Sequence, residues 1–385
     1  MNTPKIRFKG FTDDWEQRKL GDVFEQTTNF VDPNKKEIEL WSLTVEDGLT
    51  PKSERYNREF LVKKDTGFKE VRSGDIVYNP MNMTLGAVGY NGMSKSVAVS
   101  GYYTTMITNE GYDSYYINTW LKSPQAMALY KTFATGSLIE KQRVQFPTLS
   151  IIPATFPQYE EQVRIGYYFM RLDHLITLHQ RKCDETKQLK KFMLQKMFPK
   201  NGEKNPEIRF EGFTDDWEQR KLGEVFNFHY GDGNNNPSNG GQYPVFGAGG
   251  IQGRYTKYNA ENSIIIGHMG DAGCVSWGEG KHFVTYNGTI TTPKDDVFTA
   301  KFGYYLLLNM NLRKYRGGSG LPFLTYDMLT EMETKCPNSK IETQEIADYF
   351  TQLDKLITLH QRKLEEMKKQ KKALMQLLLT GIVRI

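Results

Sequence analysis

The sequence predicts an α+β fold with two mixed α/β bodies, each followed by a long helix. Two repeats predict this arrangement: residues 4–24 recur almost unchanged at 206–226, and residues 172–182 recur at 353–363. The stretches between the repeated segments, roughly 25–156 and 227–336, show no obvious likeness to each other. The pattern indicates a tandem duplication in which two constant frames surround two variable bodies.

The constant segment that precedes each body is the longer repeat. Its first copy, PKIRFKGFTDDWEQRKLGDVF, differs from the second at three of 21 positions, which are Lys5/Glu207, Lys9/Glu211 and Asp22/Glu224. The copies are 206 − 4 = 202 residues apart, whereas the 172–182 and 353–363 copies are 353 − 172 = 181 apart. The second copy is therefore 21 residues shorter between its two constant segments.

The variable bodies are expected to mix strands and helices. Short runs at 75–78, 96–99, 263–266 and 274–277 are rich in β-branched residues and bordered by glycine or polar residues, which is typical of strands. Residues 115–130 and 301–315 have the pattern of helices. The glycine-rich stretch 231–241, GDGNNNPSNGG, is expected to be the most mobile part of the second body.

The segment that follows each body is expected to be a helix of about 40 residues with a heptad seam. In the repeated region the seam consists of Ile165, Phe169, Leu172, Ile176 and His179 in the first copy, and of Ile346, Phe350, Leu353, Ile357 and His360 in the second. A helix of this length needs a partner, and the other copy is the obvious one because both belong to one chain. The paired histidines are interpreted as buried polar markers of register rather than as metal ligands.

Composition excludes several classes of protein. The net charge is 50 − 45 = +5, so any basic surface for nucleic acid has to be local. Three cysteines without CxxC or paired histidine spacing favour neither a disulfide framework nor a zinc site. The first 15 residues lack the apolar core of a signal peptide, and no stretch approaches a membrane span. A cytoplasmic protein without membrane contact is expected.

Motifs for catalysis fail on spacing. Asn79-Pro80-Met81-Asn82 lacks the second proline and the aromatic residue with which adenine methyltransferases hold an extruded base. The stretch 247–253, GAGGIQG, places glutamine where a dinucleotide-binding loop needs its third glycine. Gly280-Lys281 lacks the partner residues of a phosphate-binding loop, and the six histidines have no metal-ligand spacing. The sequence predicts neither a catalytic site nor a metal site.

Basic and amide residues in the bodies are the remaining functional signal, because such side chains read base edges and contact phosphates. Any one such segment can also be an ordinary solvated loop. The candidate DNA-binding residues are Asn79, Asn82, Lys141, Gln142, Arg143, Arg254, His268, Lys314 and Arg316.

Taken together, the repeats resemble the specificity subunits of type I restriction-modification systems. The resemblance is carried by IRF-x-GFTDDWEQRKLG at 6–21 and 208–223 and by LD-x-LITLHQRK at 172–182 and 353–363. Weaker elements are Gly74-Asp75-Ile76 with Asn79, and Tyr243-Pro244-Val245. The resemblance implies target recognition domains at 1–157 and 201–336 and conserved spacer helices at 158–200 and 337–385, the helices pairing as an antiparallel coiled coil.

The same resemblance implies a non-catalytic subunit that reads a bipartite sequence in double-stranded DNA. It implies two modification subunits as partners, which bind S-adenosylmethionine and methylate adenine at N6. It further implies two restriction subunits, which cut DNA with ATP and Mg²⁺, and no cofactor bound by this chain.

Two other functions stay open at the level of sequence. A self-sufficient adenine methyltransferase would bind S-adenosylmethionine without a partner, which the absence of a matching loop argues against. A structural coiled-coil adaptor whose two modules bind something other than DNA would fail a gel shift with duplex DNA and the methyltransferase partner.

Overall fold

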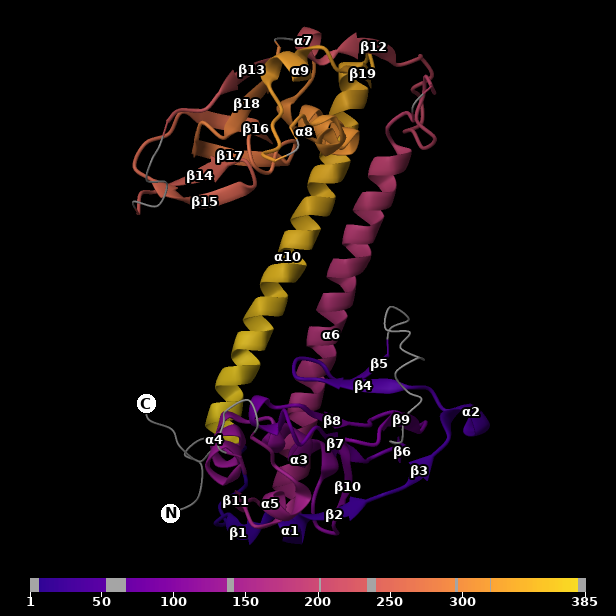
Figure 1. Cartoon of the computed structure of the whole chain (residues 1–385), viewed down its shortest axis with the longest axis vertical. Coiled ribbons are helices and arrows are strands. Elements are labelled where there is room, and N and C mark those ends of the chain that lie inside the picture. The colour runs from indigo at the N-terminus through magenta and orange to yellow at the C-terminus, as the bar shows by residue number, and fades with distance from the viewer. Residues whose placement is uncertain are drawn as a thin grey trace. The chain divides into compact units, whose positions relative to one another are not determined.

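The computed structural model describes residues 7–52, 67–136, 142–200, 202–233, 240–294, 297–318 and 320–379. The chain forms two compact units, which are treated separately below (Figure 1). Unit 1 comprises Met1–His179 and Arg362–Ile385, and unit 2 comprises Gln180–Gln361. Each unit thus contains one variable body and a segment of both long helices.

Unit 1 is built around an antiparallel sheet of four strands in the order β2-β10-β7-β8. Its strands are β1 (Glu16–Lys19), β2 (Phe24–Thr27), β3 (Phe30–Val31), β4 (Trp41–Thr44), β5 (Gly48–Pro51), β6 (Phe68–Val71), β7 (Ile76–Tyr78), β8 (Val88–Tyr90), β9 (Val97–Ser100), β10 (Thr104–Thr108) and β11 (Pro153–Phe156). Its body helices are α1 (Leu20–Val23), α2 (Pro33–Lys36), η3 (Met83–Leu85), α3 (Ser114–Leu121), α4 (Pro124–Phe133) and α5 (Phe146–Ser150). Strands β3, β6 and β9 form a second small sheet, and β4 pairs with β5.

Unit 2 is built around a sheet of six strands in the order β13-β18-β16-β17-β14-β15. Its strands are β12 (Glu218–Lys221), β13 (Phe226–Tyr230), β14 (Tyr243–Gly247), β15 (Gly250–Tyr255), β16 (Ala260–Gly267), β17 (Val275–Val284), β18 (Gly288–Pro293) and β19 (Glu333–Cys336). Its body helices are α7 (Leu222–Val225), α8 (Ala300–Met310), η5 (Leu312–Tyr315) and α9 (Tyr326–Thr330).

The two bodies share a sheet core that their sequences do not reveal. The antiparallel order β2-β10-β7-β8 in unit 1 matches β13-β18-β16-β17 in unit 2. The registers agree as well, since Phe24 lies opposite Thr108 and the repeat-related Phe226 lies opposite Pro293. The two bodies are therefore built on the same core of four strands. Their sequences can differ because buried strand positions accept many apolar side chains.

The strand in each constant segment pairs with the last strand of the body that follows it. Strand β1 pairs with β11 and β12 pairs with β19, both antiparallel. In addition, the Leu20 backbone N–H donates to the Ile152 carbonyl at 3.0 Å, and that of Leu222 donates to Met332 at 2.7 Å. Each body thus begins and ends at a pair of antiparallel strands, β1 with β11 in unit 1 and β12 with β19 in unit 2.

An ion pair with a buried glutamate and a half-buried arginine, the clamp, ties each constant segment to the first turn of the following helix. In unit 1 Arg7 donates to both carboxylate oxygens of Glu161 at 2.9 and 2.6 Å, and Trp15 Nε1 donates to the same carboxylate at 3.1 Å. In unit 2 the equivalent residues repeat the clamp: Arg209 donates to Glu342 at 2.7 and 2.9 Å, and Trp217 Nε1 donates at 3.2 Å. The clamp residues follow the 202- and 181-residue offsets of the repeats.

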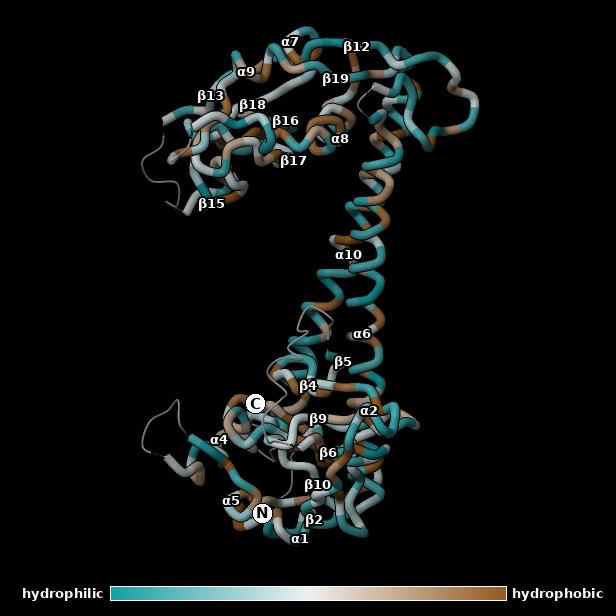
Figure 2. The backbone as a smooth tube through the Cα atoms, turned by 45° about the vertical axis from the view of Figure 1, so that its right-hand side comes forward, coloured by the Kyte–Doolittle hydropathy of each residue, from teal (hydrophilic) through white to brown (hydrophobic). Residues whose placement is uncertain are grey.

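The two long helices are α6 (Tyr159–Lys196) and α10 (Lys340–Leu379), and each has about the predicted length. All ten seam positions proposed from the sequence are buried or half-buried. Along α10, hydrophilic positions predominate and hydrophobic ones recur at intervals, as Figure 2 shows. Coiled-coil packing over the whole length stays a prediction, because the contacts described between the helices lie within each unit. Within the described residues, neither these helices nor any other is apolar enough over a sufficient length to cross a membrane.

Reciprocal ion pairs connect the helices inside each unit. In unit 2 Lys190 Nζ lies 2.6 Å from Asp354 Oδ1, and in unit 1 Lys371 Nζ lies 2.6 Å from Asp173 Oδ1. Lys190 and Lys371 are related by the 181-residue offset, as are the two aspartates. Each aspartate also accepts a 2.8 Å hydrogen bond from a tyrosine of its own body, Tyr115 or Tyr305. The lysine and aspartate side chains between the helices are thereby satisfied in the same way in both units.

Each body packs on the end of the helix from the other copy. The unit 1 core includes Met375, Leu378 and Leu379 of α10, and the unit 2 core includes Met197 and Phe198, which directly follow α6. These ends are equivalent under the 181-residue offset. This packing explains why the compact units do not coincide with consecutive stretches of the chain.

The strand predictions at 75–78, 96–99, 263–266 and 274–277 are confirmed by β7, β9, β16 and β17. The two helix predictions are wrong in one respect, because each predicted helix is interrupted in the structure. Residues 115–130 form two helices, because Ser123 caps α4 by accepting from Ala126 N and Pro124 occupies its first turn. Residues 301–315 are interrupted at Asn311, whose φ of +52° lies in the left-handed region. Most of the 231–241 stretch lies outside the described residues.

Candidate nucleic-acid interface

Three segments that are distant in sequence meet at one place in the first body. The loop after β7 is fixed where Val144 N donates to the Pro80 carbonyl at 3.0 Å. Thr135 and Arg143 form an isolated antiparallel bridge. Helix α5 begins directly after these residues, so the end of β7, the bridge and the start of α5 form a single surface.

This surface of the first body contains a cleft of about 350 Å³. Polar groups that can read base edges line it together with an exposed methionine and an exposed tyrosine: Gln26, Asn79, Arg143, Gln145, Met81 and Tyr102. The side chain of Arg143 is exposed, while its backbone N–H and carbonyl are both bonded to Thr135. A guanidinium on a fixed backbone can contact guanine O6 and N7, or phosphate.

Asn79 is constrained more tightly than its sequence context suggests. Its side-chain oxygen accepts a hydrogen bond from Met81 N at 3.0 Å, which forms a local turn. This oxygen already has a backbone partner, so the amide group keeps its donor side for a ligand. The amide group of Asn79 can therefore donate, and its oxygen can accept one further hydrogen bond, in a contact with a base or a phosphate.

The second body brings the equivalent three segments together with different side chains. Leu324 N donates to the His268 carbonyl at 2.8 Å, as Val144 does to Pro80, and Gly317 bridges Phe323, as Thr135 bridges Arg143. Helix α9 begins directly after these residues. The surface here is aromatic: the His268 ring lies 4.2 Å from the Tyr230 ring and 5.8 Å from Tyr286, and Tyr326 lies 5.2 Å from Tyr230.

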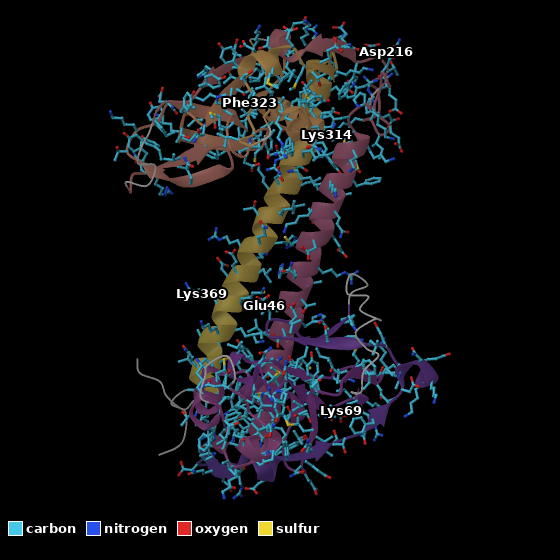
Figure 3. The ribbon with its side chains drawn as sticks, viewed as in Figure 1. Glu46, Lys69, Asp216, Lys314, Phe323 and Lys369 are labelled. Atoms are coloured by element: carbon cyan, nitrogen blue, oxygen red, sulfur yellow. The ribbon has the colours of Figure 1, made fainter. Side chains whose placement is uncertain are left out.

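The other candidates from the sequence lie at varying distances from these surfaces. Asn82 is exposed in the turn after Asn79 but does not line the cleft, Gln142 is half-buried beside Arg143, and Lys141 lies outside the described residues. Arg316 immediately precedes the Gly317–Phe323 bridge, and Lys314 lies on η5; Figure 3 labels Lys314 and Phe323 in unit 2. Arg254 lies on β15 and donates to the Gln242 carbonyl at 3.1 Å. Strands β17 and β14 separate β15 from β16, so the structure does not bring Arg254 to the His268 surface.

Sequence reasoning missed the tyrosines around His268. They come from the end of β13, the turn before β18 and the start of α9, and nothing in their local sequence distinguishes them from core residues. The available signal was indirect: His268 and Pro80 both follow buried strands of the shared core. Aligning the two cores would have pointed to the segments that meet there.

One serine–histidine pair superficially resembles a nucleophile and its base. Ser263 Oγ lies 2.9 Å from His282 Nε2, and His282 Nδ1 lies 2.8 Å from the Gly280 carbonyl. Both side chains are buried, and burial lowers the pKa of His282. The pair is a satisfied polar contact of the core. Across the described ranges, no three histidine, cysteine or carboxylate side chains group as metal ligands.

The constant helices carry a second, duplicated surface. Leu175 and Leu178 of α6 are 41% and 36% exposed, and the equivalent Leu356 and Leu359 of α10 are 46% and 45% exposed. Residues three apart share one face of a helix, so each pair forms a small apolar patch. The same patch therefore occurs once in each unit, in an identical LITLHQRK context.

Comparison with known proteins agrees with this architecture. Residues 214–369 match the model of the type I restriction modification DNA specificity domain. The resemblance to type I specificity subunits is confirmed. Two specificity subunits of Methanocaldococcus jannaschii type I restriction enzymes, MjaX and MjaVIII, are each 23% identical to the chain. The alignments cover 100% and 97% of this chain and 97% and 94% of those relatives.

A solved specificity subunit has the same fold. The subunit from M. genitalium aligns over 99% of this chain and 100% of its own length, with a TM-score of 0.73 at 16% identity. A chain from a study of type I complex assembly and conformational transition aligns over 96% and 99%, with a TM-score of 0.51 at 16% identity. The predicted combination of mixed α/β bodies with long helices is confirmed. The names of the matched domain and of these relatives assign them to DNA specificity in type I restriction systems.

Proposed function

We propose that the chain reads a bipartite target in double-stranded DNA, with one half-site for each variable body. One observation carries this proposal: equivalent segments meet in both bodies, but they present Asn79, Arg143 and Gln145 in the first and His268 with tyrosines in the second. A conserved geometry with different side chains is what two readers of different sequences require.

The same proposal makes the chain a scaffold. The exposed leucine patch occurs twice in an identical sequence, so the chain offers the same surface to two copies of one partner. We assign these patches to two modification subunits, through which two restriction subunits join the complex. S-adenosylmethionine, ATP and Mg²⁺ act in those partners, and this chain holds none of them.

Substitution of the arginines tests the DNA surface. Arg143→Ala and Arg316→Ala are each expected to weaken binding of the assembled complex to target DNA. A base-edge contact costs about 1–3 kcal/mol and relaxes one position, whereas a phosphate contact weakens all sequences alike and lowers the salt slope by about one. Lys35→Ala, which removes an 84% exposed side chain of the first body, serves as control. Unchanged affinity and salt slope for both arginine variants would place the interface elsewhere.

Substitution of the leucines tests the scaffold. Leu175→Glu with Leu178→Glu is expected to remove one of two modification subunits from the purified complex, because charge is unfavourable in an apolar contact. Leu356→Glu with Leu359→Glu is expected to remove the other, and the fourfold variant should remove both. The measurement is the mass of the complex by light scattering.

A matched control exists on the same helix. Leu189 is 44% exposed but corresponds to Gln370 in the second copy, so its patch is not duplicated. Leu189→Glu is expected to leave both partners bound. Two partners retained on the fourfold variant would contradict the assignment of the leucine patches.

A further inference from the structure

His268 is held rigidly at the end of the buried strand β16. Its backbone N–H donates to the Asn287 carbonyl and its carbonyl accepts from Leu324 N, both at 2.8 Å. The ring is fixed as well, because Nδ1 lies 3.0 Å from the Leu324 carbonyl. A carbonyl oxygen can only accept, so Nδ1 carries the hydrogen in this contact.

This contact determines the chemistry of the other ring nitrogen. In the neutral imidazole with hydrogen on Nδ1, Nε2 is a hydrogen-bond acceptor. Among the residues that the structure describes, none donates a hydrogen bond to Nε2. His268 is only 6% exposed, so this acceptor is one polar group in a largely buried side chain. Within the described residues, Nε2 is not one of the fully buried side-chain atoms that lack a partner, so solvent or a ligand can reach it.

The tyrosines around His268 lie at the boundary with solvent. The Tyr230 and His268 rings are tilted by 38° at a centroid distance of 4.2 Å, which restricts rotation of the imidazole. Tyr286 and Tyr326 are 51% and 41% exposed, so the cluster borders solvent rather than the core. A ligand edge that approaches between these rings meets an oriented acceptor.

We propose that His268 determines one position of the second half-site by accepting a hydrogen bond from the exocyclic amino group of a base. In the major groove the base donors are adenine N6 and cytosine N4, and a preoriented acceptor selects where such a donor lies. The inference rests on the proposed function, since it needs the second body to face DNA. Pro80 occupies the equivalent place in the first body and has no side-chain acceptor, so the contact belongs to the second half-site alone.

The test removes Nε2 and keeps the anchor. In His268→Asn the side-chain amide can still donate to the Leu324 carbonyl in place of Nδ1, but no acceptor remains at the position of Nε2. In cells that express the complex, this variant is expected to methylate a motif relaxed at one position of the second half-site. The first half-site is expected to be unchanged, and its retention shows that the variant folds and assembles.

His229→Asn is the matched control. His229 is exposed on β13 next to Tyr230, and neighbouring strand residues point to opposite faces of the sheet. The control is expected to leave the motif unchanged. If the His268→Asn complex methylates the same motif as the wild-type complex, the inference is overturned. If the wild-type complex recognises no motif, the proposed function itself is overturned.

A base analogue identifies the contact at the atomic level. Once the relaxed position is known, its adenine is replaced by purine, or its cytosine by pyrimidin-2-one, so that the amino group is absent. The unmodified complex is expected to lose about 10- to 100-fold in affinity, and the His268→Asn complex is expected to show no further loss. Independent, multiplying losses would overturn the inference. So would uniform weakening on all sequences with a lower salt slope, which indicates a phosphate contact.

Discussion

Glu342→Ala is expected to destabilise unit 2 by about 2–3 kcal/mol, because it leaves a half-buried guanidinium without its counter-ion. The side chains of Glu342 and Arg209 are 1% and 13% exposed, and Trp217 Nε1 loses its acceptor in the same variant. Hydrogen bonding to Glu342 raises the pKa of Arg209, so the arginine stays charged in the folded state. Unfolding in urea, followed by tryptophan fluorescence, measures the change.

A glutamate on the same helix provides the comparison. Glu345 is exposed one turn away on α10, and Glu345→Ala is expected to change stability by less than about 0.5 kcal/mol. The double variant Arg209→Met with Glu342→Leu is expected to recover most of the loss, since no unpaired charge stays buried. Equal stability of Glu342→Ala and Glu345→Ala would show that the clamp does not hold the frame together.

A chain that carries the first body in both frames is expected to recognise the first half-site twice. The exchange replaces 227–332 with a copy of 25–152, because Ile152 and Met332 occupy equivalent places in the two frames. The clamp and the pairing of β12 with β19 are retained, so the new body is joined to the same constant segments as the old one. The methylated motif, mapped in cells that express the modification subunits, is the measurement.

The reciprocal chain, with 227–332 in place of 25–152, is expected to recognise the second half-site twice. Companion variants also exchange residues 193–198 with 374–379, because these helix ends pack on the bodies. A motif that retains neither original half would contradict the modular interpretation.

The frames were predictable from the sequence and the interface was not. Near-identical repeats predict identical packing, so the clamp and the reciprocal lysine–aspartate pairs obey the repeat offsets that the sequence already contains. Strand and helix-rich regions were predictable from their residues, whereas the breaks at Ser123 and Asn311 depend on single capping and left-handed residues. The surface around His268 combines residues from three elements whose proximity depends on strand order, and local patterns carry no information about strand order.

The repeated clamp has a consequence for how new specificities arise. The clamp is the same in both copies of the constant segments. A body that folds correctly between the constant segments of one copy can therefore fold in the same way between those of the other. The nearly identical 21-residue segments also place similar coding sequence before both bodies. Genes can recombine there without changing the constant segments that hold each body. A pool of n interchangeable bodies would therefore encode n × n ordered targets, and each newly acquired body would add 2n + 1 of them.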